Sequence, residues 1–210
     1  MKQEVVISKN LDTKQAVEEL YSQLKYKEQP ALVIFLASTR YDFELATKEI
    51  KKCFPNSIVV GTTTSGEITK QGFIENSIVL TTFICNRTKV KAALIKDAVH
   101  FPILEKEKIS KAAKECGISC EDVNSHKNAF AMTFINGNHN IEEMVLSLFY
   151  AVIKNEKFQV VGGLHALSGE GHSQGHAHIA KAHHAQGGPS GFYGFIEFHR
   201  EISSHSKKKR

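Results

Sequence analysis

The chain has 210 residues, of which 41% are hydrophobic and 23% charged, a composition typical of a globular protein with room for a sizeable core. The net charge of +5 does not indicate a nucleic-acid-binding surface, because the terminal Lys207, Lys208, Lys209 and Arg210 supply four of those charges. The longest apolar run, residues 31–37, is too short to cross a bilayer, and the N-terminus lacks the apolar core of a secretory signal. We therefore expect a cytoplasmic protein with neither a membrane nor a nucleic-acid partner.

Strand-like and helix-like patterns alternate along the first 161 residues. Apolar or alternating runs predict strands at 4–8, 31–37, 57–60, 73–84, 90–95, 129–135 and 158–163, and helical periodicity predicts helices at 11–25, 41–54, 103–116 and 141–153. Asp12 is a candidate helix N-cap, and Asn140 with Glu143 resembles a capping box. No internal repeat of fixed period is evident. The alternation predicts an α/β fold, a layered sheet with interleaved helices.

The composition changes after Gly163. Eight of the eleven histidines lie from His165 onward, and nine of the fourteen glycines from Gly162 onward. Apart from a strand candidate at 192–198, this part has no sustained period. We expect a domain at 1–163 followed by an irregular His/Gly-rich C-terminal segment at 164–210 with a basic end. An altered reading frame or a truncated gene would produce such a tail.

The stretch "VVGTTTSGEI" raises the question of a phosphate site. Gly61 and Gly66 have the spacing of a P-loop, in which a lysine and a hydroxyl residue follow the second glycine. Here Glu67 and Ile68 take those places, so a polyphosphate would meet a repelling carboxylate and no magnesium-binding hydroxyl. Two interpretations stay open: a tight turn at a strand end, or a strand end whose hydroxyl and amide groups face a small polar ligand.

Other strand ends carry similar chemistry: one runs into Ser38, Thr39 and Arg40, and later ones into polar or small residues. If these ends lie together, they offer neutral hydrogen-bonding groups and the Arg40 guanidinium, a set that suits a carboxylate-bearing metabolite such as an amino acid. The candidate ligand-binding residues are Ser38, Thr39, Arg40, Gly61, Thr62, Thr63, Thr64, Ser65, Gly66, Asn136, Gly137, Gly162 and Gly163.

The ordered set "ALVIFLASTRYD", "PNSIVVGTTTSGEI", "GFIENSIVLTTF", "FINGN" and "FQVVGG" resembles the N-terminal half of a FIST domain over about residues 30–163. This resemblance implies a non-catalytic, intracellular sensory module of signal transduction that binds small ligands such as amino acids and acts on signalling output proteins. The sequence departs from the family pattern after Gly163, and no C-terminal FIST portion is recognisable in residues 164–210.

Histidines are dense between residues 172 and 184, a part we call the His-rich segment. Imidazoles there are candidate ligands for Zn²⁺ or Ni²⁺, which makes a transition-metal-binding protein the alternative function, whereas an incidental solvated tail is the simpler interpretation. The candidate ligands are His172, His176, His178, His183 and His184. We expect no other cofactor and no enzyme activity, because no nucleophile motif is present. An interaction scaffold without a small ligand is a third class.

Overall fold

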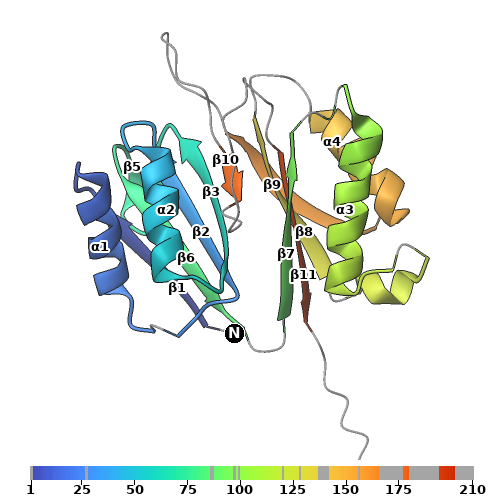
Figure 1. Cartoon of the computed structure of the whole chain (residues 1–210), viewed down its shortest axis with the longest axis horizontal. Helices are drawn as coiled ribbons and strands as arrows, with labels where there is room; N and C mark the ends of the chain where they lie inside the picture. Colours follow the sequence, from blue (N-terminus) through green and yellow to red (C-terminus); the bar gives the residue numbers. More distant parts are fainter. Residues whose placement is uncertain are drawn as a thin grey trace, which may run out of the picture.

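The structure is a computed structural model of the whole chain, and it describes residues 2–26, 28–85, 88–96, 98, 100–119, 121–127, 129–136, 142–155, 157–165, 177–179 and 194–201. These residues form four layers, in which two β-sheets pack face to face and helices cover the outer face of each sheet (Figure 1). The α/β fold expected from the sequence is therefore confirmed, and its strands are divided between two facing sheets.

The first sheet comes mainly from the N-terminal part of the chain. Its elements and the hairpin attached to it are β1 (Lys2–Ser8), α1 (Thr13–Gln23), β2 (Leu32–Ser38), α2 (Phe43–Cys53), β3 (Ile58–Thr64), β4 (Glu67–Thr69), β5 (Gly72–Ile74), β6 (Ile78–Ile84) and β10 (Ala177–Ile179). Within the described residues the strand order is β1-β6-β2-β3-β10. Strands β2 and β3 are parallel, whereas β6 runs antiparallel to both β1 and β2.

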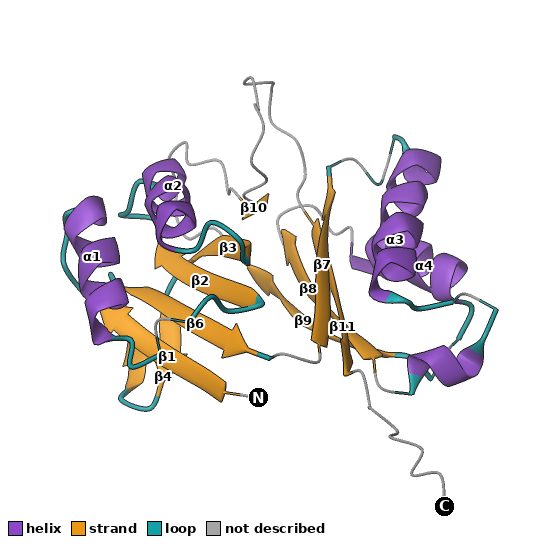
Figure 2. Ribbon diagram, turned by 60° about the horizontal axis from the view of Figure 1, so that its bottom comes forward, coloured by secondary structure: helices purple, strands orange, loops and turns teal. Residues whose placement is uncertain are grey.

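The second sheet follows directly. Its elements are β7 (Thr88–Ile95), α3 (Pro102–Cys116), the 3-10 turn η1 (Val123–His126), β8 (Ala129–Asn136), α4 (Glu142–Ile153), β9 (Gln159–His165) and β11 (Gly194–Glu201). Its strand order in the described part of the chain is β7-β11-β8-β9. Strand β11 runs antiparallel between β7 and β8, and β8 is parallel to β9. Figure 2 shows the helices of each sheet on the side that faces away from the other sheet.

The two halves repeat one topology. Each runs strand, helix, strand, helix, strand, and each then returns with an antiparallel strand that inserts between its first two strands. The registers agree as well: the equivalent pairs are Phe35–Gly61 with Thr133–Gly162, and Ala37–Ile78 with Ile135–Gly194. The connections differ in length, since residues 24–31 join α1 to β2 whereas residues 117–128 join α3 to β8. A repeat of fixed period is therefore absent although the topology is duplicated.

Local sequence explains where the first helices begin. Asp12 caps α1 through a hydrogen bond from the Gln15 backbone N–H at 2.8 Å, and Asp42 caps α2 through one from Leu45 at 2.9 Å. The N-cap expected at Asp12 is thus confirmed, whereas Asn140, the expected cap of α4, lies outside the described residues.

The core has three parts, one at each interface between neighbouring layers. One lies between α1, α2 and the first sheet and another between α3, α4 and the second sheet. The third fills the space between the sheets, where Leu32, Ile34 and Val60 meet Val90 and neighbouring apolar side chains. Because both faces of each sheet are covered, the central strands read as continuous apolar runs in the sequence.

The segment after residue 163 contributes strands to both sheets. Ala177–Ile179 pairs with β3, and Gly194–Glu201 forms the strand between β7 and β8, which confirms the strand expected near 192–198. Most of the His/Gly-rich part expected to be irregular lies outside the described residues. The domain boundary at residue 163 stays a prediction.

Candidate functional site

The polar strand ends of the two sheets lie at the same end of the sandwich. Strands β1, β2 and β3 share one direction, and so do β7, β8 and β9. Figure 1 shows the arrows of β3 and β7 pointing toward the same end of the molecule. The carboxyl ends of β2, β3, β8 and β9, at Ser38, Thr64, Asn136 and His165, therefore all lie at this end. The ligand hypothesis requires this arrangement, although the ends belong to facing sheets and not to one sheet edge.

Strand β3 is longer than its apolar run indicated. It continues through Thr64, so Gly61 and the three threonines that follow it lie inside the strand, and the turn falls on Ser65 and Gly66. Threonine is β-branched and suits a pleated, half-buried surface, which explains the extension. The hydroxyl groups of Thr62, Thr63 and Thr64 are thus held by a strand, whereas Ser65 lies in the turn.

Alternation along β3 sends its threonines to opposite faces. Val59 belongs to the core beneath the helices and Val60 to the core between the sheets. The period of two therefore places Thr63 on the helix-covered face and Thr62 and Thr64 on the face toward the second sheet.

Thr63 carries an unsatisfied polar atom. Its side chain is buried, and its hydroxyl oxygen has no hydrogen-bond partner among the described residues. Such a group costs about 1–3 kcal/mol when it is left unpaired. A polar ligand atom that reaches the end of β3 would supply the missing hydrogen bond.

Tight packing around Gly61 explains why this position is a glycine. A β-carbon at this position would lie 2.1 Å from Cε1 of Phe35, whose ring stacks on Phe43 at a centroid distance of 5.0 Å. In the second half, a β-carbon on the equivalent Gly162 would lie 2.1 Å from the Thr133 hydroxyl. Both glycines, included among the candidate ligand residues, thus make room for the neighbouring parallel strand.

Glu67 is a buried carboxylate that ties the end of β3 to the start of β6. It is 2% exposed, and it accepts hydrogen bonds from the hydroxyl groups of Thr64 and Ser77. In the sequence, Glu67 stood out only as a group that would repel phosphate. The structure shows a different role, because the carboxylate oxygens are directed at hydroxyl groups of the protein. Thr64 lies three residues before Glu67, but Ser77 lies ten residues after it, so no short sequence pattern marks this cluster.

Tyr41 completes the polar cluster. Its hydroxyl lies 3.4 Å from the carbonyl oxygen of Ser8, at the end of β1, and 3.3 Å from that of Asn76, which precedes β6. Burial raises the pKa of Tyr41 above its ordinary value, and the charge of Glu67 adds to the rise. This tyrosine was not among the residues predicted from the sequence.

The raised pKa of Tyr41 makes stability depend on alkaline pH. In the unfolded chain the phenol loses its proton near pH 10, whereas the folded chain retains it, so the free energy of unfolding falls as the pH rises above about 10. Phenylalanine cannot ionise, so between pH 9 and pH 11 the free energy of unfolding should fall less in Tyr41→Phe than in the wild type. Urea unfolding at both pH values measures it, with Tyr150→Phe, at an exposed position, as the control. An equal difference at both pH values would contradict the prediction.

The other candidates differ in accessibility. Thr39, Arg40 and Ser65 are exposed, and the Arg40 guanidinium has no hydrogen bond or salt bridge within the described residues. Ser38 is buried, and its hydroxyl accepts a long hydrogen bond of 3.5 Å from the Arg40 backbone N–H. Asn136 ends β8, whereas Gly137 lies outside the described residues. The exposed guanidinium thus stands near the polar cluster without a competing partner in the part of the chain that is described.

The described residues do not test the hypothesis that the His-rich segment binds a metal ion. Of the histidines proposed as ligands, His178 lies in β10, where its backbone pairs opposite Gly61, and His172, His176, His183 and His184 lie outside the described residues. Elsewhere in the described ranges, no group of three or more His, Cys, Asp or Glu side chains is placed to hold a metal ion. Metal binding and the expected lack of enzyme activity both stay predictions.

No helix among the described residues is both long and apolar enough to span a membrane.

Comparison with protein families shows to which family the chain belongs. The model of the FIST N domain matches residues 31–193, from the residue before β2 to the residue before β11. The chain belongs to the FIST family. FIST domains are sensory domains of signal-transduction proteins, and this general role applies here. The FIST match also runs past Gly163, where the resemblance was expected to end, and covers the His-rich segment. No curated protein sequence matches this FIST domain.

Proposed function

We propose that this FIST domain senses a small polar metabolite, an amino acid or a similar carboxylate, at the carboxyl ends of β2 and β3. The observation that carries the proposal is the buried Thr63 hydroxyl, which lacks a partner among the described residues. The neighbouring hydroxyl groups of Thr64 and Ser77, by contrast, donate to Glu67. In layered α/β proteins the carboxyl ends of strands are the usual ligand position.

The charges near these strand ends fit an anionic ligand group. Arg40 stands in the connection between β2 and α2, is exposed, and has a guanidinium that can hold a carboxylate through two parallel hydrogen bonds. Glu67 does not compete for it, because its oxygens accept from Thr64 and Ser77. In this proposal Arg40 holds the carboxylate, and the Thr63 hydroxyl binds a polar group of the ligand. The bound state then acts on a signalling output protein.

Thr63→Val tests the site without removing volume. The variant deletes an unpaired hydroxyl, so the free energy of unfolding of the ligand-free protein should stay equal or rise by about 1 kcal/mol. A thermal-shift screen with amino acids and related carboxylates should show a rise in Tm for the wild type that grows with ligand concentration. The affinity of Thr63→Val for the same compound should be about tenfold lower, since one hydrogen bond to the ligand is lost.

Thr82→Val provides a matched control. Thr82 also has a buried hydroxyl without a partner in the described structure, but it pairs with Val33 near the opposite end of β2. Its variant should change stability as Thr63→Val does and leave ligand affinity unchanged. Arg40→Gln should weaken binding as well. A Tm that no compound raises in a folded sample, or equal loss of affinity in both threonine variants, would refute the proposal.

A further inference from the structure

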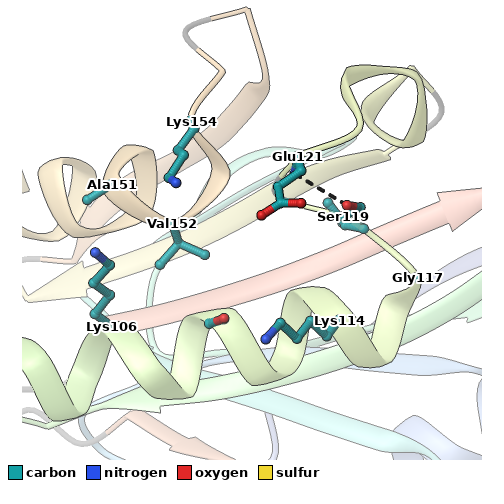
Figure 3. A pocket seen from close by; sticks show the side chains of 10 residues that line it. Lys106, Lys114, Gly117, Ser119, Glu121, Ala151, Val152 and Lys154 are labelled. Carbon is teal, nitrogen blue, oxygen red and sulfur yellow. Dashed lines mark hydrogen bonds between the residues drawn. The ribbon is translucent and has the colours of Figure 1, made fainter.

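A hollow lies on the outer face of the second half, away from the strand ends. It has a volume of about 640 Å³ and lies where α3, the C-terminal part of α4 and the residues after α3 meet (Figure 3). Its floor is apolar and includes Val152 and Ile118, which are both buried. This volume is within the range of small-molecule sites in proteins, roughly 300–1,000 Å³.

Three lysines surround the hollow. Lys106 and Lys114 come from α3, Lys154 follows α4, and Figure 3 shows the three side chains on different sides of Val152. The carboxylate among the lining residues is that of Glu121. The side chains that line the hollow therefore carry an excess of positive charge. An excess of positive charge around one hollow favours the binding of an anion.

The three ammonium groups are free of protein partners in the described part of the chain. Other lysines of this region are paired: Lys108 contacts both oxygens of Glu105 at 2.7 and 2.8 Å, and Lys91 contacts Glu115 at 2.9 Å. No salt bridge or hydrogen bond of this kind reaches the lysines of the hollow within the described residues. Their charges are available to a ligand.

Local structure holds these lysines in place. Lys106, Ser110 and Lys114 are spaced by four residues and so lie on one face of α3. Lys154 has a φ of 53°, in the left-handed region where glycine is usual after a helix, and its N–H donates to the Tyr150 carbonyl at 2.8 Å. Glycine at this position would end the helix with less backbone strain, whereas lysine adds a positive charge to the hollow.

We propose that this hollow binds a small anion with two or more phosphate groups. Lysine acts as a compact charge with freely rotating donors, which suits phosphate oxygens spread over several groups. Among the described residues that line the hollow, lysines alone supply the positive charge. The Ser110 hydroxyl adds a donor between Lys106 and Lys114. The site is separate from the strand ends and does not depend on the function proposed for them.

Isothermal titration with inorganic tripolyphosphate at low salt tests the site. The wild type should bind it, and Lys114→Gln should bind about fivefold more weakly through the loss of one ionic contact. Lys111→Gln is the matched control, because it makes the same charge change at an exposed position of α3 that does not line the hollow. Its affinity should stay within about twofold of the wild type. Undetectable binding to the wild type at millimolar concentration, or equal weakening in both variants, would overturn the proposal.

Lys154→Gly separates binding from stability. Glycine adopts a positive φ without strain, so the Tm should stay equal or rise by up to about 3 °C, while affinity for tripolyphosphate falls several-fold. Unchanged affinity in this variant would overturn the site. A single-stranded oligonucleotide that binds more tightly than tripolyphosphate, with the same dependence on Lys114 and Lys154, would replace the small anion by a nucleic acid and also overturn the proposal.

Discussion

Replacing Gly61 with alanine should lower the free energy of unfolding by about 3 kcal/mol, the upper part of the range for overpacking a core. The added methyl group would lie 2.1 Å from Cε1 and 2.2 Å from Cζ of Phe35, and Phe35 is fully buried. The ring cannot simply turn away, because it stacks on Phe43, which is also buried. Relief therefore requires a shift of β2 relative to β3. Urea unfolding followed by circular dichroism measures the loss.

Two further variants isolate the cause. Gly72→Ala should cost only about 1 kcal/mol, because a β-carbon there meets no atom within 4 Å and only its φ of 95° opposes alanine. Phe35→Leu shortens the side chain that the methyl group would strike. In the Phe35→Leu background, Gly61→Ala should therefore cost less than it does in the wild type, by about 1 kcal/mol or more. Strict additivity of the two substitutions would show that the ring contact is not the source of the loss.

Much of the local structure could be predicted from the sequence, because it depends on short-range patterns. The helix over 43–53 has its apolar face, its Asp42 cap and its end before Pro55 all within one short segment. Gly61 shows the limit of that reasoning. Its P-loop spacing with Gly66 suggested a loop, but the reason for this glycine is the Phe35 ring on a neighbouring strand, and such a contact is invisible without the register.

The duplication was equally hidden from a search for periodicity. Both halves contain "VVG" followed by "SGE", at residues 59–61 and 65–67 and again at 160–162 and 168–170, but the spacing differs between the two copies. The equivalence of Gly61 and Gly162 emerges only when the strand pairs are compared. Ser38 and Asn136 end the equivalent strands β2 and β8. The polar strand ends noticed in the sequence therefore occupy equivalent positions in the two halves of the fold.

Removing the Glu67 carboxylate should have the second large effect on stability. Glu67→Ala leaves the Thr64 and Ser77 hydroxyl groups without their acceptor and opens a void at a position that is 2% exposed. Unpaired buried donors cost about 1–3 kcal/mol each, and hydroxyl groups that turn to other acceptors recover part of this, so we expect a loss of about 3 kcal/mol. Glu75→Ala removes an exposed carboxylate from the same region and should stay within about 0.5 kcal/mol of the wild type.

The charge and the shape of Glu67 can be separated. Glu67→Gln keeps the volume and one carbonyl acceptor, so it should cost about 1 kcal/mol, well below the alanine variant. Ser77→Ala should be destabilising in the wild type but nearly neutral in the Glu67→Ala background, because its hydrogen-bond partner is already gone. If Ser77→Ala lowered the free energy of unfolding as much in the Glu67→Ala background as in the wild type, Ser77 would act through other contacts. The expected coupling would instead establish that the end of β3 is held to β6 by a buried acid, on which the position of the Thr63 hydroxyl depends.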